Sequence, residues 1–189
     1  MRRIAIFISG DGSNALKMLE EFNSSRTVEV ALVYSSKQNL KVQNACKEKG
    51  IEFQFLSWNL KTQEAIHWLC IKKDINWVVL AGFLKLIPES FIVSFPNRIV
   101  NIHPALLPKF GGKGMYGMHV HEAVIAANSS ESGISIHFVN GAYDEGQIIA
   151  KFKVDLDPNE TPETLSLKIR ALEHEYFSET VAQLVQGDH

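Results

Sequence analysis

The sequence predicts an α/β fold built on a mostly parallel twisted sheet, with helices on both faces and an antiparallel strand pair near the C-terminus. Two observations predict it. Apolar runs of strand length, typical of strands buried on both faces, alternate with stretches of helical spacing. Nearer the C-terminus, two strand-like segments are joined by a turn-forming stretch, which favours an antiparallel hairpin.

The first half of the chain supplies the alternating units. Residues 4–8 are all apolar, as in a central parallel strand, and a glycine loop and a helical pattern follow at once. Gly50 is placed to end the second helix, because glycine suits the left-handed conformation at helix C-termini. Alternating helices and strands imply crossovers and a parallel sheet. We expect strands at 3–9, 28–34, 51–56 and 77–80, and helices at 15–22, 40–49 and 62–73.

The second half begins with a short strand that runs into Pro104 and Pro108, which continue neither sheet nor helix. Thr161 and Pro162 suit the N-cap and the first position of a last helix. We expect strands at 98–102, 132–139 and 147–152, a helix start at 119–127 and a long helix from 162. No linker, repeat or low-complexity segment divides the chain, so residues 1–189 are expected to form a single domain.

Composition favours a soluble globular enzyme or binding domain. The chain has 46% hydrophobic and 21% charged residues, a net charge of −2 and no basic run, so neither nucleic acid nor an anionic membrane is an expected partner. It also has no apolar stretch of spanning length and no signal peptide, and we expect a cytoplasmic location. The two cysteines, Cys46 and Cys70, lie in apolar helical patterns and are expected to be buried thiols.

Two polar residues at the end of the predicted strand 98–102 are the strongest candidates for chemistry. Residues i and i+2 of a strand share a face, so Asn101 and His103 point into the same space. In open α/β sheets, ligands bind at such strand ends. A proline-rich turn with a capped polar residue is the structural alternative for these positions.

The glycine loop before the first helix is a candidate phosphate site, because a helix N-terminus presents N–H groups and positive potential. Its spacing, Gly10-x-Gly12-x-x-Ala15, also fits a relaxed dinucleotide motif. The second strand ends without the carboxylate that a dinucleotide ribose requires. A glycine turn with Ser13 or Asn14 as N-cap is compatible with either interpretation.

Two further loops and the histidines leave alternatives open. Residues 81–88 carry enough apolar bulk either to receive a flat ligand or to pack under a helix. Residues 111–118 contain four glycines, and we predict a mobile lid that closes over ligands, with a surface insertion as the alternative. His103, His119 and His121 invite a metal interpretation, but no cysteine or carboxylate cluster accompanies them and we expect no metal.

The remaining interpretations of the histidines are structural. His119 and His121 flank a helix start, where capping and solvent exposure are common. His137 is expected as a partner that supports His103 from behind. The histidines interpreted as surface residues are His67, His174 and His189.

A longer string extends the Asn101 and His103 pair: Asn101-Ile102-His103-Pro104-Ala105-Leu106-Leu107-Pro108. It resembles the Asn-x-His-Pro-Ser-Leu-Leu-Pro signature of the folate-dependent formyltransferases and departs from it at Ala105. In that family an aspartate in a Tyr/Leu-Asp-x-Gly turn completes the catalytic set, and Asp144 matches it. The order of the motifs along the chain is similar to that of the family branch that formylates glycinamide ribonucleotide.

The resemblance implies a Rossmann-like fold, 10-formyltetrahydrofolate as co-substrate and the amine of glycinamide ribonucleotide as acceptor. It implies that the acceptor is bound by Gly12, Ser13, Asn14 and Glu173. It also implies folate contacts at Leu84, Lys85, Leu86, Ile87, Asn101, Asn140, Gly141, Ala142 and Tyr143, while Lys61 and Gln63 stand where some members have a folate-binding basic residue. Asp11 stands where asparagine is frequent, and its carboxylate is expected to point away from the phosphate.

The chemistry of the residues agrees with this resemblance. Attack of an amine on a formyl carbon creates an oxyanion, to which Asn101 and a protonated His103 could donate hydrogen bonds. Asp144 would favour the imidazolium and assist proton transfer. Two other functions fit the motifs less completely: hydrolysis of formyl folate without an acceptor, and nucleotide binding without catalysis.

Overall fold

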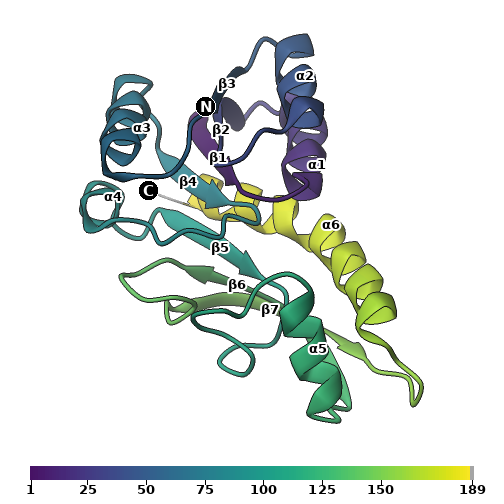
Figure 1. Ribbon diagram of the computed structural model, residues 1–189. Helices are drawn as coiled ribbons and strands as arrows, with labels where there is room; N and C mark the ends of the chain where they lie inside the picture. Colours follow the sequence, from purple (N-terminus) through teal and green to yellow (C-terminus); the bar gives the residue numbers. More distant parts are fainter. Residues whose placement is uncertain (188–189) are drawn as a thin grey trace.

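A computed structural model describes residues 1–187 as one seven-stranded sheet in the order β3-β2-β1-β4-β5-β6-β7 (Figure 1). The strands from β3 to β5 are parallel, and β6 and β7 are antiparallel to their neighbours. The predicted fold class is therefore confirmed. The strands are β1 (Arg2–Ile8), β2 (Val28–Ser35), β3 (Glu52–Phe55), β4 (Trp77–Leu80), β5 (Ile99–His103), β6 (Glu131–Phe138) and β7 (Ile148–Asp155).

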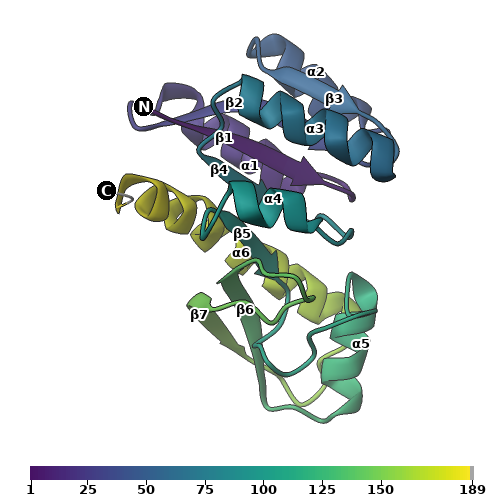
Figure 2. The ribbon, with the colours of Figure 1, turned by 90° about the vertical axis from the view of Figure 1, so that its left-hand side faces the viewer.

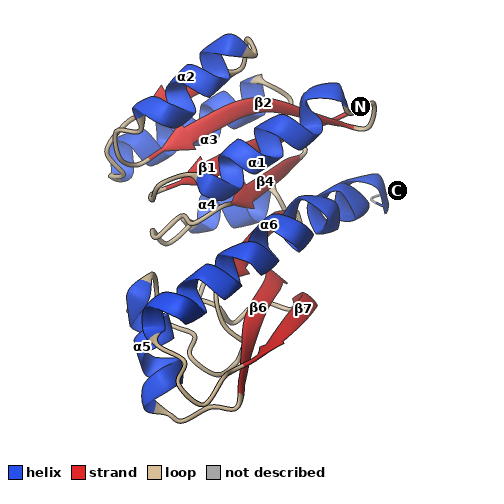
Figure 3. Cartoon of the chain, turned by 90° about the vertical axis from the view of Figure 1, so that its right-hand side faces the viewer, coloured by secondary structure: helices blue, strands red, loops and turns tan. Residues whose placement is uncertain are grey.

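Helices cover both faces of the sheet. Helices α3 and α4 lie on one face (Figure 2), and α1, α2 and α6 lie on the other (Figure 3). Helix α4, with only six residues, was not predicted, because so short a segment shows no helical period. The helices are α1 (Ser13–Glu21), α2 (Leu40–Glu48), α3 (Leu60–Lys72), α4 (Glu89–Ser94), α5 (Met118–Ala126) and α6 (Pro162–Gly187), with a 3₁₀ turn at Phe22–Ser24.

The two faces of the sheet build two separate apolar clusters by strict alternation along the strands. In β1, Ile4, Ile6 and Ile8 pack under α1, α2 and α6, whereas Ala5 and Phe7 pack under α3 and α4. All five are fully buried. An uninterrupted apolar strand therefore serves both layers, as the sequence predicts.

Both cysteines are buried and free. Burial raises the pKa of Cys46 and of Cys70 to about 12, so neither thiol is ionised near neutral pH. Their expected role as packing residues is confirmed.

The chain order creates a crevice at the carboxyl ends of the central strands. After β1 the chain passes outward to β2 and β3, and then returns to the other side of β1 with β4. The loops that leave the carboxyl ends of β1 and β4 consequently diverge, which is where open α/β sheets bind ligands. Helix α6 runs obliquely across the sheet and contacts α1 and α5 (Figure 3). No helix within residues 1–187 is long and apolar enough to span a membrane.

Candidate active site

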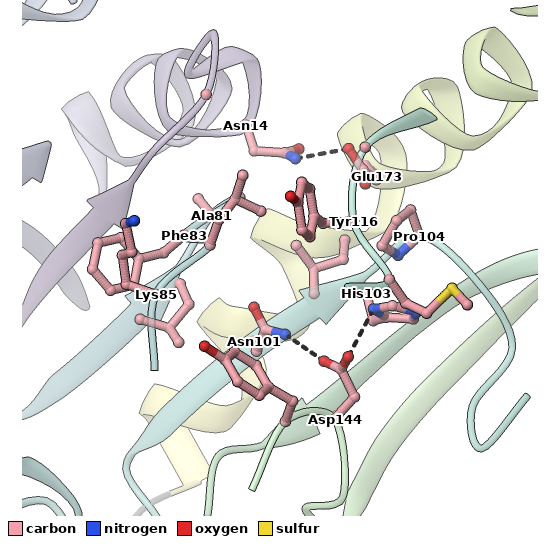
Figure 4. A pocket seen from close by; sticks show the side chains of 18 of the residues that line it. Asn14, Ala81, Phe83, Lys85, Asn101, His103, Pro104, Tyr116, Asp144 and Glu173 are labelled. Carbon is pink, nitrogen blue, oxygen red and sulfur yellow. Dashed lines mark hydrogen bonds and ion pairs between the residues drawn. The ribbon is translucent and has the colours of Figure 1, made fainter. Parts of the chain in front are cut away.

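A cavity of about 660 Å³ occupies this crevice (Figure 4). Its walls come from the loop after β1, the loop after β4, the end of β5, the loop before α5, the turn between β6 and β7, and the middle of α6. The volume suits small organic ligands. Segments that are far apart in the sequence thus meet in one place, including Gly12, Asn101, His103, Asp144 and Glu173.

The loop after β1 presents the N-terminus of α1 to the cavity. Gly12 occupies the N-cap position with a left-handed φ of 76° and has no side chain of its own to cap the helix. A Cβ at Gly12 would lie 2.5 Å from Val42 Cγ2, so only glycine fits there. Ser13 and Asn14 lie inside the helix, and the N-cap alternative for these two residues is wrong.

The amide of Asn14 reaches across the cavity to α6. Its Nδ2 donates to Glu173 Oε2 over 2.8 Å, across 159 positions of the sequence (Figure 4). Burial raises the pKa of Glu173 above its ordinary range, although the Asn14 amide and the Arg170 charge oppose this. The structure thereby brings together two predicted substrate-binding residues from opposite ends of the chain.

Arg170 lines the cavity and was not predicted from the sequence. Its guanidinium lies 3.1 Å from Oδ2 of Asp11, a residue of the loop after β1. Arg170 lies on α6, one helical turn before Glu173. Asp11 also accepts the Ser13 N–H over 3.1 Å. The carboxylate of Asp11 is thus directed at a cation and an N–H group of its own loop. The sequence signal that could have identified Arg170 is its position three residues before Glu173, which puts both side chains on the same face of the helix.

The loop after β4 is held rigidly before it meets the cavity. The Leu84 N–H donates to Ser9 Oγ over 3.1 Å, and the Trp58 indole donates to the Leu86 carbonyl over 3.3 Å. Phe83 packs within a cluster of aromatic rings, with 5.1 Å between its centroid and that of Trp58. Leu84 and Leu86 are exposed to the cavity, as are Lys85 and, in part, the otherwise buried Ile87.

Strand β5 delivers Asn101 and His103 to the centre of the cavity, on the same face, as alternation predicts. Asn101 Nδ2 lies 3.0 Å from His137 Nε2 and 3.4 Å from Asp144 Oδ1. Its amide oxygen points away from Asp144 (Figure 4). The two N–H groups of Asn101 are therefore directed at His137 and Asp144, the second over a long distance.

Asp144 lies at the centre of a polar cluster that contains Asn101, His103 and His137. It takes a left-handed φ of 57°, which asparagine and aspartate tolerate better than most side chains. Its Oδ2 accepts the Gly112 N–H over 3.0 Å and lies 3.4 Å from His103 Nδ1. Burial acts to raise the pKa of Asp144, but the neighbouring His137, His103 and Gly112 N–H together hold it below its ordinary value.

His103 is 3% exposed and is held from both sides. Its Nε2 donates to the Phe110 carbonyl over 2.7 Å, while Nδ1 faces Asp144. Burial lowers the pKa of His103 below its ordinary value, and the opposing effects of Asp144 and the Phe110 carbonyl do not reverse this. The resting imidazole is therefore favoured in its neutral form, in contrast to the protonated donor that we expected.

Two interpretations of other histidines are wrong. The expected partner of His103, His137, contacts Asn101 and shares the Asp144 carboxylate with His103. His121 was expected at an exposed helix start and is 5% exposed, whereas its neighbour His119 is exposed as expected. His174 was interpreted as a surface residue, yet its Nε2 is buried. His189 lies outside the described residues.

Two predicted folate-contact residues do not line the cavity. Asn140 and Gly141 are exposed on the turn between β6 and β7, where Asn140 Oδ1 accepts the Ala142 N–H over 3.0 Å. Ala142 and Tyr143 do line the cavity. Within residues 1–187, no group of three or more histidine, cysteine, aspartate or glutamate side chains is arranged to hold a metal ion.

Comparison with known proteins places this cavity in a family. A family model described as formyl transferase matches residues 2–181. The chain is 38% identical, over 98% of its length, to a chloroplastic phosphoribosylglycinamide formyltransferase of Arabidopsis thaliana, of which it spans 66%. It is 30% identical, over 99% of its length, to the phosphoribosylglycinamide formyltransferase of Haemophilus influenzae, of which it spans 89%.

Solved structures agree in fold and in extent. The phosphoribosylglycinamide formyltransferase from Bacillus halodurans superposes with a TM-score of 0.88 and 34% identity, over all of this chain and 97% of that chain. Glycinamide ribonucleotide transformylase 1 from Geobacillus kaustophilus gives the same TM-score at 29% identity, over 98% and 99% of the two chains. Because the family model covers more than nine-tenths of the sequence, the chain belongs to the formyl transferase family.

Proposed function

We propose that this protein transfers the formyl group of 10-formyltetrahydrofolate to the primary amine of glycinamide ribonucleotide, a step of purine biosynthesis. One observation carries the proposal. The cluster of Asn101, His103 and Asp144 lies in the same cavity as the N-terminus of α1 and the apolar loop after β4. A phosphate-bearing acceptor and a flat donor can therefore meet at one reacting centre.

The acceptor would enter from the side of α1. Gly12, Ser13 and Asn14 place backbone N–H groups at the positive end of the helix, and the phosphate would take over the Ser13 N–H from Asp11 Oδ1. A phosphate bound there would compete with Asp11 for the guanidinium of Arg170, 3.1 Å away from that carboxylate. Glu173 then stands one helical turn further along α6, in position to bind the ribose hydroxyls.

The donor would enter from the other side of the cluster. Leu84, Leu86 and Tyr143 are 37–43% exposed large side chains at the cavity, which a flat pterin ring would cover. Lys85 and the remaining backbone groups of the loop would bind its polar edge. Because Trp58 and Ser9 fix this loop, little ordering is required when the ring binds.

The long contacts to Asp144 mark the two positions that can turn to the reaction: an N–H of Asn101, and His103 Nδ1, which donates once it is protonated. Asn101 and His103 each hold one protein partner at 2.7–3.0 Å and approach Asp144 at 3.4 Å, where hydrogen bonds are weaker. A formyl oxygen that enters beside Asp144 would take over these weak contacts. Donors so placed stabilise the oxyanion of the tetrahedral intermediate.

Protonation of His103 is then tied to the progress of the reaction. Burial disfavours the imidazolium in the resting state, as its lowered pKa shows. Negative charge that develops on the formyl oxygen, added to the charge of Asp144, would favour a proton on Nδ1. The donor is thus strongest when the transition state requires it.

The proposal is tested by the absorbance change of the folate, measured with glycinamide ribonucleotide, with unphosphorylated glycinamide, and without acceptor. We expect loss of formyl only with an acceptor, and faster with the phosphorylated one. Formyl loss without acceptor would favour a hydrolase, and no reaction would favour a binding module. The cytoplasmic location and the absence of nucleic-acid partners stay predictions.

A further inference from the structure

The cavity contains a buried histidine to which the chemistry above gives no role. His121 projects from α5 into the lining of the cavity and is 5% exposed. Its Nδ1 is buried without a partner. Neither ring nitrogen of His121 forms a hydrogen bond with any residue in the described range 1–187. Polar atoms of buried side chains are nearly always paired in native proteins. Because Nε2 is not among the inaccessible unpaired atoms, it is the ring nitrogen that a ligand in the cavity can reach.

The other two buried histidines of the cavity are already occupied. His103 contacts the Phe110 carbonyl and Asp144. His137 donates from Nδ1 to the Phe138 carbonyl over 2.7 Å and contacts Asn101 with Nε2. Among the imidazoles buried here within residues 1–187, His121 is the one without a hydrogen bond at either ring nitrogen.

The charge state of His121 makes it an acceptor. Burial lowers its pKa, and a proton on the nearby His103 would lower it further. A neutral imidazole has one N–H group and one nitrogen with a free lone pair. His121 therefore brings to the reacting centre a base that is unprotonated near neutral pH.

The acceptor amine needs such a group. It reacts through its own lone pair, so its N–H groups must be held by hydrogen-bond acceptors. The carboxylates in the cavity wall are engaged: Asp11 by Arg170, Glu173 by Asn14, and Asp144 by the catalytic cluster. His121 is the basic side chain left for this purpose among the residues described.

We propose that His121 accepts an N–H hydrogen bond from the acceptor amine and takes that proton once the new C–N bond has formed. This inference rests on the proposed formyl transfer. The amine nitrogen bonds to the formyl carbon and loses one proton to His121. The bond from that carbon to the folate nitrogen breaks, the folate nitrogen takes the proton that His121 received, and the imidazole returns to its neutral form. No further reactant is required.

The test compares His121→Gln and His121→Phe with the wild-type protein. The glutamine carbonyl can hold the amine but cannot take its proton, so we expect an unchanged KM for the acceptor and a kcat lower by about 10²-fold. His121→Phe can neither hold the amine nor take its proton, so the KM for the acceptor should rise and kcat should fall, with the KM for the folate unchanged. His119→Gln is the matched control, because His119 is an exposed histidine on the same helix. Wild-type kcat in both His121 variants would overturn the inference.

A second measurement needs no variant to fold. In the ¹⁵N-labelled wild-type protein, glycinamide ribonucleotide added alone should shift one ring-nitrogen resonance of His121. An unshifted His121 at saturating acceptor would also overturn the inference. If the wild-type protein transfers no formyl group, the proposed function fails; if it does and the His121 variants match it, only the role of His121 fails.

Discussion

At the scale of single residues, Asn101 and His103 define the reaction. Each is held by one short hydrogen bond and turns its second hydrogen-bonding position toward Asp144 over 3.4 Å. We expect Asn101→Ala and His103→Ala each to lower kcat by about 10²–10³-fold, the usual effect of removing one oxyanion donor. The rate of formyl transfer, measured on purified variants whose circular dichroism spectra match that of the wild-type protein, checks this. Turnover near the wild-type rate would remove that residue from the mechanism.

Asp144 sets the pH dependence through His103. Burial lowers the pKa of His103 and the Asp144 carboxylate opposes that effect, so Asp144→Asn should lower the pKa further. If the rate depends on the protonation state of His103, the acidic limb of the pH profile moves to lower pH. Asparagine also tolerates the left-handed backbone of this position, so the fold should be retained. An NMR titration of His103 in both proteins decides the matter; equal pKa values would show that the pair is uncoupled.

At the scale of elements, the start of the loop before α5 positions the catalytic pair. The Phe110 carbonyl and the Gly112 N–H contact His103 and Asp144, and Gly111 lies between them. A Cβ at Gly111 would lie 2.5 Å from Leu107 Cδ2 and 3.3 Å from Asp144 Cβ. We therefore expect Gly111→Ala to lower kcat by about 10–10²-fold through displacement of Asp144.

The control for this substitution is Gly187→Ala, where an added Cβ meets open space at the end of α6. Kinetics at saturating substrates and the midpoint of urea unfolding should be measured together. A Gly111→Ala protein that loses stability in proportion to its activity would indicate ordinary misfolding instead of displaced catalytic groups.

The remainder of the same loop stays our predicted lid. Residues 112–118 line the cavity, and Gly112, Gly114 and Gly117 have left-handed φ values of 96°, 92° and 57°. Since the Gly112 N–H donates a hydrogen bond to Asp144, the hinge of the closing segment would lie after Gly112. Limited proteolysis should cut this segment more slowly when both ligands are bound. Equal cutting rates would leave it a surface insertion.

At the scale of the whole molecule, buried neutral histidines make stability depend on pH. His103 and His121 have folded-state pKa values below 6.5, their ordinary value, so the unfolded chain binds more protons as the pH falls from about 6.5 toward the folded values. The free energy of unfolding should therefore fall in that window. Urea unfolding at a series of pH values checks this, and His121→Phe should flatten the curve. A slope as steep in the variant would contradict the assignment.

Much of this molecule was predictable because its strands are apolar on both faces. Runs such as residues 4–8 gave the strands and their parallel order, and the motif at Asn101 and His103 gave the centre of the site. Partners across the fold were harder. Alternation puts His137 on a face without saying which side chain it meets, and α4 is too short for periodicity. Helix-start statistics placed His121 in solvent, although tertiary packing buries it.

The hydrogen bond from the Trp58 indole to the Leu86 carbonyl gives the protein a built-in optical reporter. Indole emission responds to the polarity and hydrogen bonding around Nε1, so a ring settling on Leu84 and Leu86 would alter the fluorescence of Trp58. Of the two other tryptophans, Trp68 is 61% exposed on α3, and Trp77 is buried beneath the opposite layer. A signal that responds to folate alone and disappears in Trp58→Phe would follow donor binding in real time, separately from catalysis and without any label.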